Sequence, residues 1–155
     1  MQAEMWARTP SNLGMADLLL FVKALGLARR AQRVSAEPIN LVVENMSPHG
    51  GGNRHHSVDR LALATARATM RWARWFGGLD TCLIRSLVLG SMLADHQDVA
   101  LVIGFKPGVE EEGVDGHAWV TLAGRPIGPD GILAQDDYSR LFAVPFVGCR
   151  LKGGP

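Results

Sequence analysis

Residues 80–87 read DTCLIRSL and residues 116–122 read GHAWVTL, and these two segments say most about the architecture. In the first, polar residues just before Cys82 can cap a helix that has this cysteine in its first turn. The second alternates as strands do, with His117 and Trp119 on one face. The sequence therefore predicts a cysteine at the start of a helix and a histidine on a later strand.

Three helices are expected before any strand. The first ends near Arg33, the second begins at Ser57 or Asp59 and ends at Gly77-Gly78, and the third runs from Asp80 or Thr81 to about Ala94. The first is apolar on nearly every side, so the rest of the fold or a partner chain must cover it. One face of the first helix contains Met15, Leu18, Leu19, Val22 and Leu25, and the predicted core face of the second contains Leu61, Thr65, Ala68, Trp72 and Trp75.

The second half of the chain reads as strands. We expect strands over residues 99–105, 116–122 and 142–147, with a short one ending near Asp130. Residues 47–56, rich in glycine and histidine, indicate a flexible loop. Helices that precede strands favour an α+β fold, in which N-terminal helices pack on a small, largely antiparallel sheet within one domain, residues 1–155.

Composition excludes several classes of protein. The 155 residues include 47% hydrophobic and 20% charged side chains, as expected for a folded globular domain. A net charge of +1 argues against nucleic acid or anionic lipid as a partner. The apolar run at residues 18–22 is too short to span a membrane, and no secretory signal is recognisable, so we expect a cytoplasmic protein.

Cys82, His117 and Asp130 can together form a nucleophile, a base and a residue that orients the base. The positive end of a helix dipole favours the thiolate of Cys82, which is the nucleophilic form. Asp130 follows His117 by thirteen residues, and a hairpin would bring the two side by side. A buried structural cysteine and a structural strand histidine are the plain alternatives.

The order of these motifs resembles the peptidase of lasso-peptide biosynthesis, a bacterial family within the transglutaminase-like superfamily. The resemblance covers roughly residues 57–147 and rests on residues 82–87, on Leu101-Val102-Ile103-Gly104 in a strand and on His117-Ala118-Trp119-Val120 in the next. It implies a transglutaminase-like or papain-like cysteine peptidase fold. It also implies an enzyme that needs no cofactor.

The resemblance further implies removal of the leader segment from a ribosomally made precursor peptide, whose core an ATP-dependent cyclase then closes. A separate leader-recognition protein is expected, because this chain has no room for that domain. Catalysis maps onto Cys82, His117 and Asp130. Asp130 stands about one residue later than the family pattern, so Asp136 and Asp137 compete with it for the third role.

Arg67, Arg71 and Arg74 form a basic strip on the second predicted helix. It is either a solvated helix face or a docking site for an acidic peptide or partner. The apolar N-terminal helix is the other surface on which the leader or its recognition protein could dock.

Other functions remain open at this level. A transglutaminase-type acyl transferase would use the same three residues, because both reactions pass through a thioester. A non-catalytic peptide-binding module on the same fold is also compatible. We expect no metal site, since His49, His55, His56 and Asp59 lack the spacing of a zinc site, and Cys149 reads as a small apolar filler or an exposed thiol.

Overall fold

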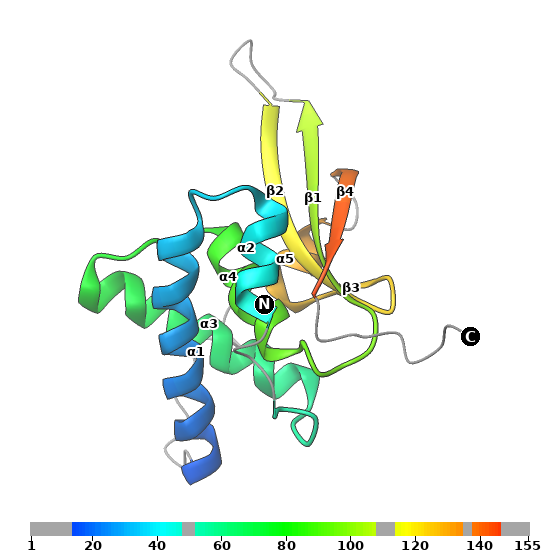
Figure 1. Ribbon diagram of the computed structural model, residues 1–155. Helices are drawn as coiled ribbons and strands as arrows, with labels where there is room; N and C mark the ends of the chain where they lie inside the picture. The colour runs from blue at the N-terminus through cyan, green and yellow to red at the C-terminus, as the bar shows by residue number, and fades with distance from the viewer. Residues whose placement is uncertain (1–13, 48–51, 108–113, 135–137, 147–155) are drawn as a thin grey trace.

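The computed structural model describes residues 14–47, 52–107, 114–134 and 138–146 (Figure 1). Five helices and four strands lie within these ranges, and the helices gather on one side of the sheet. In chain order the elements are α1 (Met15–Val34), α2 (Ile39–Met46), α3 (Val58–Phe76), α4 (Cys82–Met92), β1 (Val99–Pro107), β2 (Val114–Leu122), β3 (Arg125–Ile127), α5 (Gly128–Ala134) and β4 (Ser139–Pro145).

The four strands form one antiparallel sheet in the order β3-β2-β1-β4. His117 on β2 lies opposite Gly104 on β1, and the register between β1 and β4 shifts between Ile103 and Gly104. The predicted α+β class, with helices packed on an antiparallel sheet, is confirmed.

The core lies between the helices and one face of the sheet. Helix α4 packs against β1 and β2, and α1 covers α3 and α4. Strand alternation places Ala118 and Val120 in this core, whereas Trp119 joins Val102 and Tyr138 in a smaller cluster. His117 therefore projects toward the aromatic cluster and away from the main core, as its spacing from Trp119 predicts.

The predicted start and end of α3 and the predicted start of α4 are confirmed, while α4 ends at Met92, slightly before the expected Ala94. The Ser57 hydroxyl accepts a hydrogen bond from the Arg60 amide at 3.3 Å and caps α3. Gly77 ends α3 with a φ of 63°, a left-handed conformation that favours glycine. Thr81 caps α4 by accepting a hydrogen bond from the Ile84 amide.

Several expectations were wrong in detail. Helices α2 and α5 were not predicted, and the third strand ends at Ile127, so that Asp130 lies in α5. Trp75 was expected in the core but is 55% exposed, because the apolar spacing of α3 continues beyond the part of the helix that the core covers.

The glycine-rich and histidine-rich loop before α3 was expected to be flexible. In its described part, the Asn53 side chain is buried and donates a hydrogen bond to the Met92 carbonyl at 2.9 Å.

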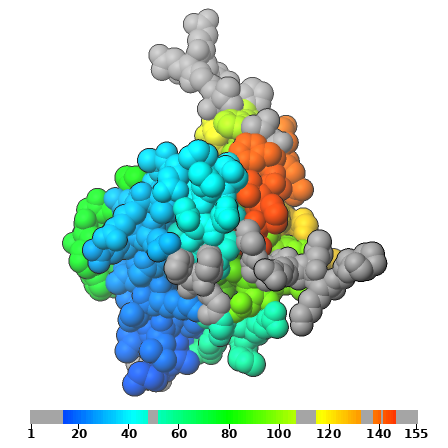
Figure 2. Space-filling model, in the orientation of Figure 1, coloured from blue at the N-terminus to red at the C-terminus, as the bar shows by residue number. Residues whose placement is uncertain are grey.

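Helix α1 buries the side opposite its most apolar stripe. Leu20, Ala24, Leu27, Ala28 and Ala31 face the core. Met15, Leu18, Leu19 and Val22 are exposed, and Met15 reaches 73%. Figure 2 shows α1 and α2 adjoining on one face of the molecule, with β4 beside α2. The rest of the described fold leaves this stripe uncovered.

Among the helices of the described ranges, none is both long enough and apolar enough to cross a membrane.

Candidate active site

Cys82 is the first residue of α4, so it lies in the first turn of the helix as predicted, and it is partly buried against the core. The first amides of a helix have no partner within it, and the helix dipole is positive at this end. Both effects favour a negative charge at the position of the sulfur. Cys82 therefore lies at the N-terminal end of α4, a placement found for cysteine nucleophiles.

The His117 ring is oriented by a main-chain oxygen. Its Nε2 lies 3.0 Å from the carbonyl oxygen of Asp130. A carbonyl can only accept, so Nε2 must carry the hydrogen, and the lone pair of the neutral ring then belongs to Nδ1. This tautomer leaves Nδ1 as the nitrogen that can accept a proton.

Aromatic side chains stack beside this imidazole. The ring centroid of Tyr138 lies 4.9 Å from that of His117, and the ring of Trp119 lies 6.0 Å away. The Tyr138 hydroxyl donates to Asp115 at 2.9 Å, which raises the pKa of Tyr138. Lys106 lies 4.7 Å from the centre of the same ring. The stacked rings of Tyr138 and Trp119 restrict rotation of the His117 imidazole.

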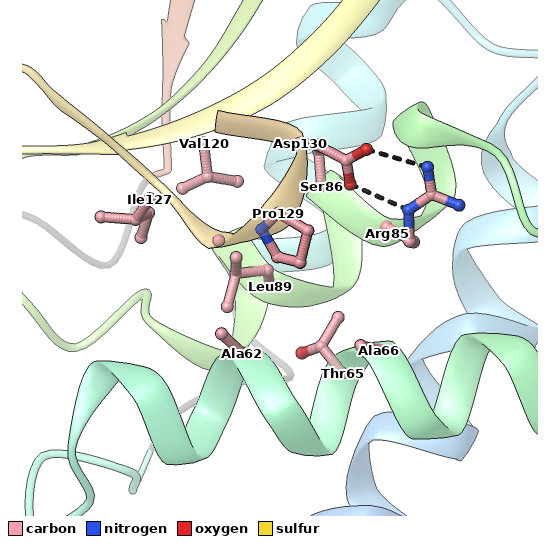
Figure 3. Close-up of a pocket in the computed structure, with 11 residues that line it drawn as sticks. Ala62, Thr65, Ala66, Arg85, Ser86, Leu89, Val120, Ile127, Pro129 and Asp130 are labelled. Atoms are coloured by element: carbon pink, nitrogen blue, oxygen red, sulfur yellow. Dashed lines mark hydrogen bonds and ion pairs between the residues drawn. The ribbon is translucent and has the colours of Figure 1, made fainter. Parts of the chain in front are cut away.

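The Asp130 carboxylate bonds to Arg85 and not to His117 (Figure 3). Arg85 Nε and Nη2 each donate to one carboxylate oxygen at 2.8 Å, and Asp130 is only 7% exposed. The hydrogen bonds to Asp130 also raise the pKa of Arg85. Asp130 lies beside His117, but it contacts the ring through its main-chain oxygen in α5 and not through the expected carboxylate.

Arg85 has further partners next to the cysteine. Its Nη1 donates to the backbone oxygen of Asp80 at 3.1 Å and to the Asp80 carboxylate at 3.0 Å. Asp80 precedes Cys82 by two residues. Arg85 therefore joins the segment that leads into α4 to the residue that orients His117.

A second contact joins α4 to β2, the strand that contains His117. The Ser86 hydroxyl is buried and donates to the Ala118 carbonyl at 3.0 Å. Ser86 lies one turn after Cys82 on the same helix face, and Ala118 directly follows His117. Within the described ranges Cys82 and His117 share no hydrogen bond, which is common for such pairs without substrate.

Arg85 and Ser86 were missed as site residues. Both lie in the segment that identified Cys82, at helical spacings of three and four from it, which is the available signal. Their partners, Asp130 and the Ala118 carbonyl, lie 45 and 32 residues along the chain. No local pattern identifies such partners.

The other candidate residues are placed as follows. On α3, Arg71 lies 5.1 Å from the centre of the Trp75 ring, Arg74 is exposed and Arg67 is partly buried. His49, Asp136, Asp137 and Cys149 lie outside the described residues. Within those residues, no group of three or more histidine, cysteine or acidic side chains could hold a metal ion.

The chain was compared with protein families, with curated proteins and with solved structures. The family model described as the transglutaminase-like superfamily matches residues 19–143. No curated protein and no solved structure shows significant similarity. The family match spans Cys82, His117 and Asp130 and most of the described fold. The chain belongs to the transglutaminase-like superfamily.

Proposed function

We propose that this protein is a cysteine peptidase that removes the leader from a lasso-peptide precursor. The observation that carries the proposal is the bond from His117 Nε2 to the Asp130 carbonyl, because it leaves Nδ1 available as a base. The nucleophile it would serve begins a helix whose first turns dock against the same strand. The resemblance of both motifs to the lasso-peptide peptidases supplies the substrate class.

In the proposed reaction, His117 Nδ1 takes the thiol proton as the Cys82 sulfur attacks the carbonyl carbon of the scissile bond. In this proposal the backbone amide of Cys82 stabilises the resulting oxyanion. The C–N bond then breaks, and His117 gives its proton to the leaving amine, which becomes the N-terminus of the core peptide. Water, deprotonated by His117, hydrolyses the thioester and releases the leader with a free carboxylate.

A separate leader-recognition protein is part of the proposal, and the lasso cyclase would act next on the released core peptide. Two surfaces could receive the recognition protein or the leader. The exposed face of α1 presents Leu19 and Val22 in its first half and Arg29 and Arg33 in its second. The strip of Arg67, Arg71 and Arg74 on α3 is the other. An apolar partner with acidic side chains would complement either surface.

The test is cleavage of a synthetic precursor by the purified chain with its recognition protein, in water enriched in ¹⁸O. A peptidase should release a leader whose new carboxylate carries ¹⁸O, together with a core peptide that has a free amine. An acyl transferase should instead join the leader to an added amine without incorporating ¹⁸O. If neither product forms, and the Cys82→Ala protein still binds the precursor as tightly as wild type, the chain is a peptide-binding module.

A further inference from the structure

We infer that Arg85 is a positioning residue for the proposed base, His117. Arg85 binds the Asp130 carboxylate, and this fixes the Asp130 carbonyl where it accepts a hydrogen bond from His117 Nε2. This inference rests on the proposed roles of Cys82 and His117. It changes the role of the third residue, because Asp130 would act on the imidazole through its main chain and on Arg85 through its side chain.

Both the main-chain carbonyl and the side-chain carboxylate of Asp130 accept hydrogen bonds. Its carbonyl oxygen lies 3.0 Å from His117 Nε2, and its two carboxylate oxygens each lie 2.8 Å from an Arg85 nitrogen. Two parallel bonds between planar groups fix orientation as well as distance. Since side chain and carbonyl belong to one residue near the start of a short helix, fixing the carboxylate also limits rotation of the carbonyl.

Arg85 also forms hydrogen bonds with Asp80. The Asp80 backbone oxygen and carboxylate both accept from Nη1, while Nε and Nη2 serve Asp130. Three nitrogens of one guanidinium therefore bridge the segment before Cys82 and the helix that orients His117. A lysine has a single charged nitrogen without this fork, so it cannot reproduce both sets of bonds.

A main-chain acceptor has a chemical consequence. A neutral carbonyl selects the tautomer with hydrogen on Nε2, as a carboxylate would, but it attracts the imidazolium less strongly. Among the residues that the structure describes, the charged groups with contacts around Cys82 and His117 are Asp80 and Arg85 near Cys82, Asp130 on α5, and Lys106 with Asp115 beside Tyr138. Arg85 is the member of this set that contacts both the Asp80 segment and α5.

The test is the pH profile of Cys82 alkylation by iodoacetamide, measured by mass spectrometry in a Cys149→Ala background. This readout needs no peptide, so it can succeed or fail separately from the proposed peptidase activity. Without an aligned His117, the thiolate should form only at higher pH. For Arg85→Met we expect the rate at pH 6.5 to fall about tenfold or more while the rate at pH 9.5 stays near wild type.

Three variants complete the design. Arg85→Lys should restore little of the rate at pH 6.5, whereas adding guanidinium ion to Arg85→Ala should restore part of it. Arg125→Met is the matched control, because Arg125 is exposed on β3, and its profile should equal that of the parent. Circular dichroism checks folding, and if Arg85→Met does not fold, the lysine variant and the rescue decide.

Two outcomes overturn the inference. One is a folded Arg85→Met protein with the parental pH profile. The other is an equal loss of rate at both pH values, which would mean that Arg85 affects only access to Cys82.

Discussion

The Nε2 atom of His117 lies 3.0 Å from the main-chain oxygen of Asp130, whose carboxylate turns away to Arg85. The residue that orients the proposed base is therefore tied to α4 by its side chain and to β2 by its backbone. This division of roles makes substitutions at Asp130 unusually informative.

Asp130→Asn should lower kcat/KM only modestly, because the carbonyl that receives His117 is retained. Loss of one charged hydrogen bond to Arg85 corresponds to about a tenfold effect. Loss of an orienting carboxylate in a catalytic triad costs about 10⁴-fold, and such a loss here would assign that role to the Asp130 side chain. Asp136→Asn and Asp137→Asn, assayed beside it, should behave as wild type, and a dead Asp137→Asn enzyme would move the role there.

Cys82→Ala and Cys82→Ser should abolish cleavage of the precursor while the protein stays folded, since no other group replaces the thiolate. Cys149→Ala serves as the comparison and should retain nearly full activity. Quantitative mass spectrometry of precursor, leader and core peptide is the measurement. Processing by Cys82→Ala at the wild-type rate would show that the nucleophile lies elsewhere.

Cleavage should depend on the recognition protein. A protein that binds both leader and peptidase raises the local concentration of the scissile bond to about the millimolar range. The isolated chain should then cut slowly at micromolar precursor, and the recognition protein should accelerate it strongly. Efficient, selective cleavage by the chain alone would contradict the two-protein proposal.

The docking surface can be located with charge-reversing and apolar-to-acidic variants. Leu19→Glu with Val22→Glu on α1, or Arg67, Arg71 and Arg74 each changed to Glu on α3, should weaken the acceleration while sparing the slow basal reaction. Leu41→Glu, at an exposed leucine of α2, is the control. If both multiple variants respond normally to the recognition protein, neither surface is the docking site.

Two glycines should respond oppositely to alanine. A Cβ at Gly104 would lie 2.6 Å from the Trp119 ring and 2.8 Å from the Ser139 carbonyl, opposite His117. Gly104→Ala should therefore destabilise the protein by about 1–3 kcal/mol and lower activity. A Cβ at Gly26 meets nothing within 4 Å, and Gly26→Ala in helix α1 should stabilise by about 0.5–1 kcal/mol. Urea unfolding of both variants checks the pair.

The ion pair between Asp17 on α1 and Arg60 on α3 should make stability depend on pH. The hydrogen bond from Arg60 lowers the pKa of Asp17 from its ordinary value of 3.8. The ion pair therefore stabilises the fold fully above about pH 4, and this stabilisation is lost as the pH falls through the lowered pKa of Asp17. Asp17→Asn should have a lower urea midpoint than wild type at pH 6, and the difference should vanish near pH 2. A difference that persists there would assign the effect to packing.

Features of this fold that depend on residues close together in the sequence could be predicted from the sequence. Caps at Ser57 and Thr81, the glycine end at Gly77 and the alternation around His117 all follow from short patterns. Helix α5 was missed because the residues up to Asp130 were interpreted as a short strand, whereas β3 ends at Ile127 and the helix begins at Gly128. The role of Arg85 was missed because its partner is fixed by the way α4 packs against α5, which no spacing encodes.

The contact between Arg85 and Asp130 spans 45 positions of the chain. Synthesis proceeds from the N-terminus, so Cys82 and His117 leave the ribosome before Asp130 does. On the proposed roles, a nascent chain that ends before α5 has its thiol and its imidazole but no acceptor to align the ring. Proteolytic activity would then begin only after α5 has left the ribosome, when the chain can align the proposed base.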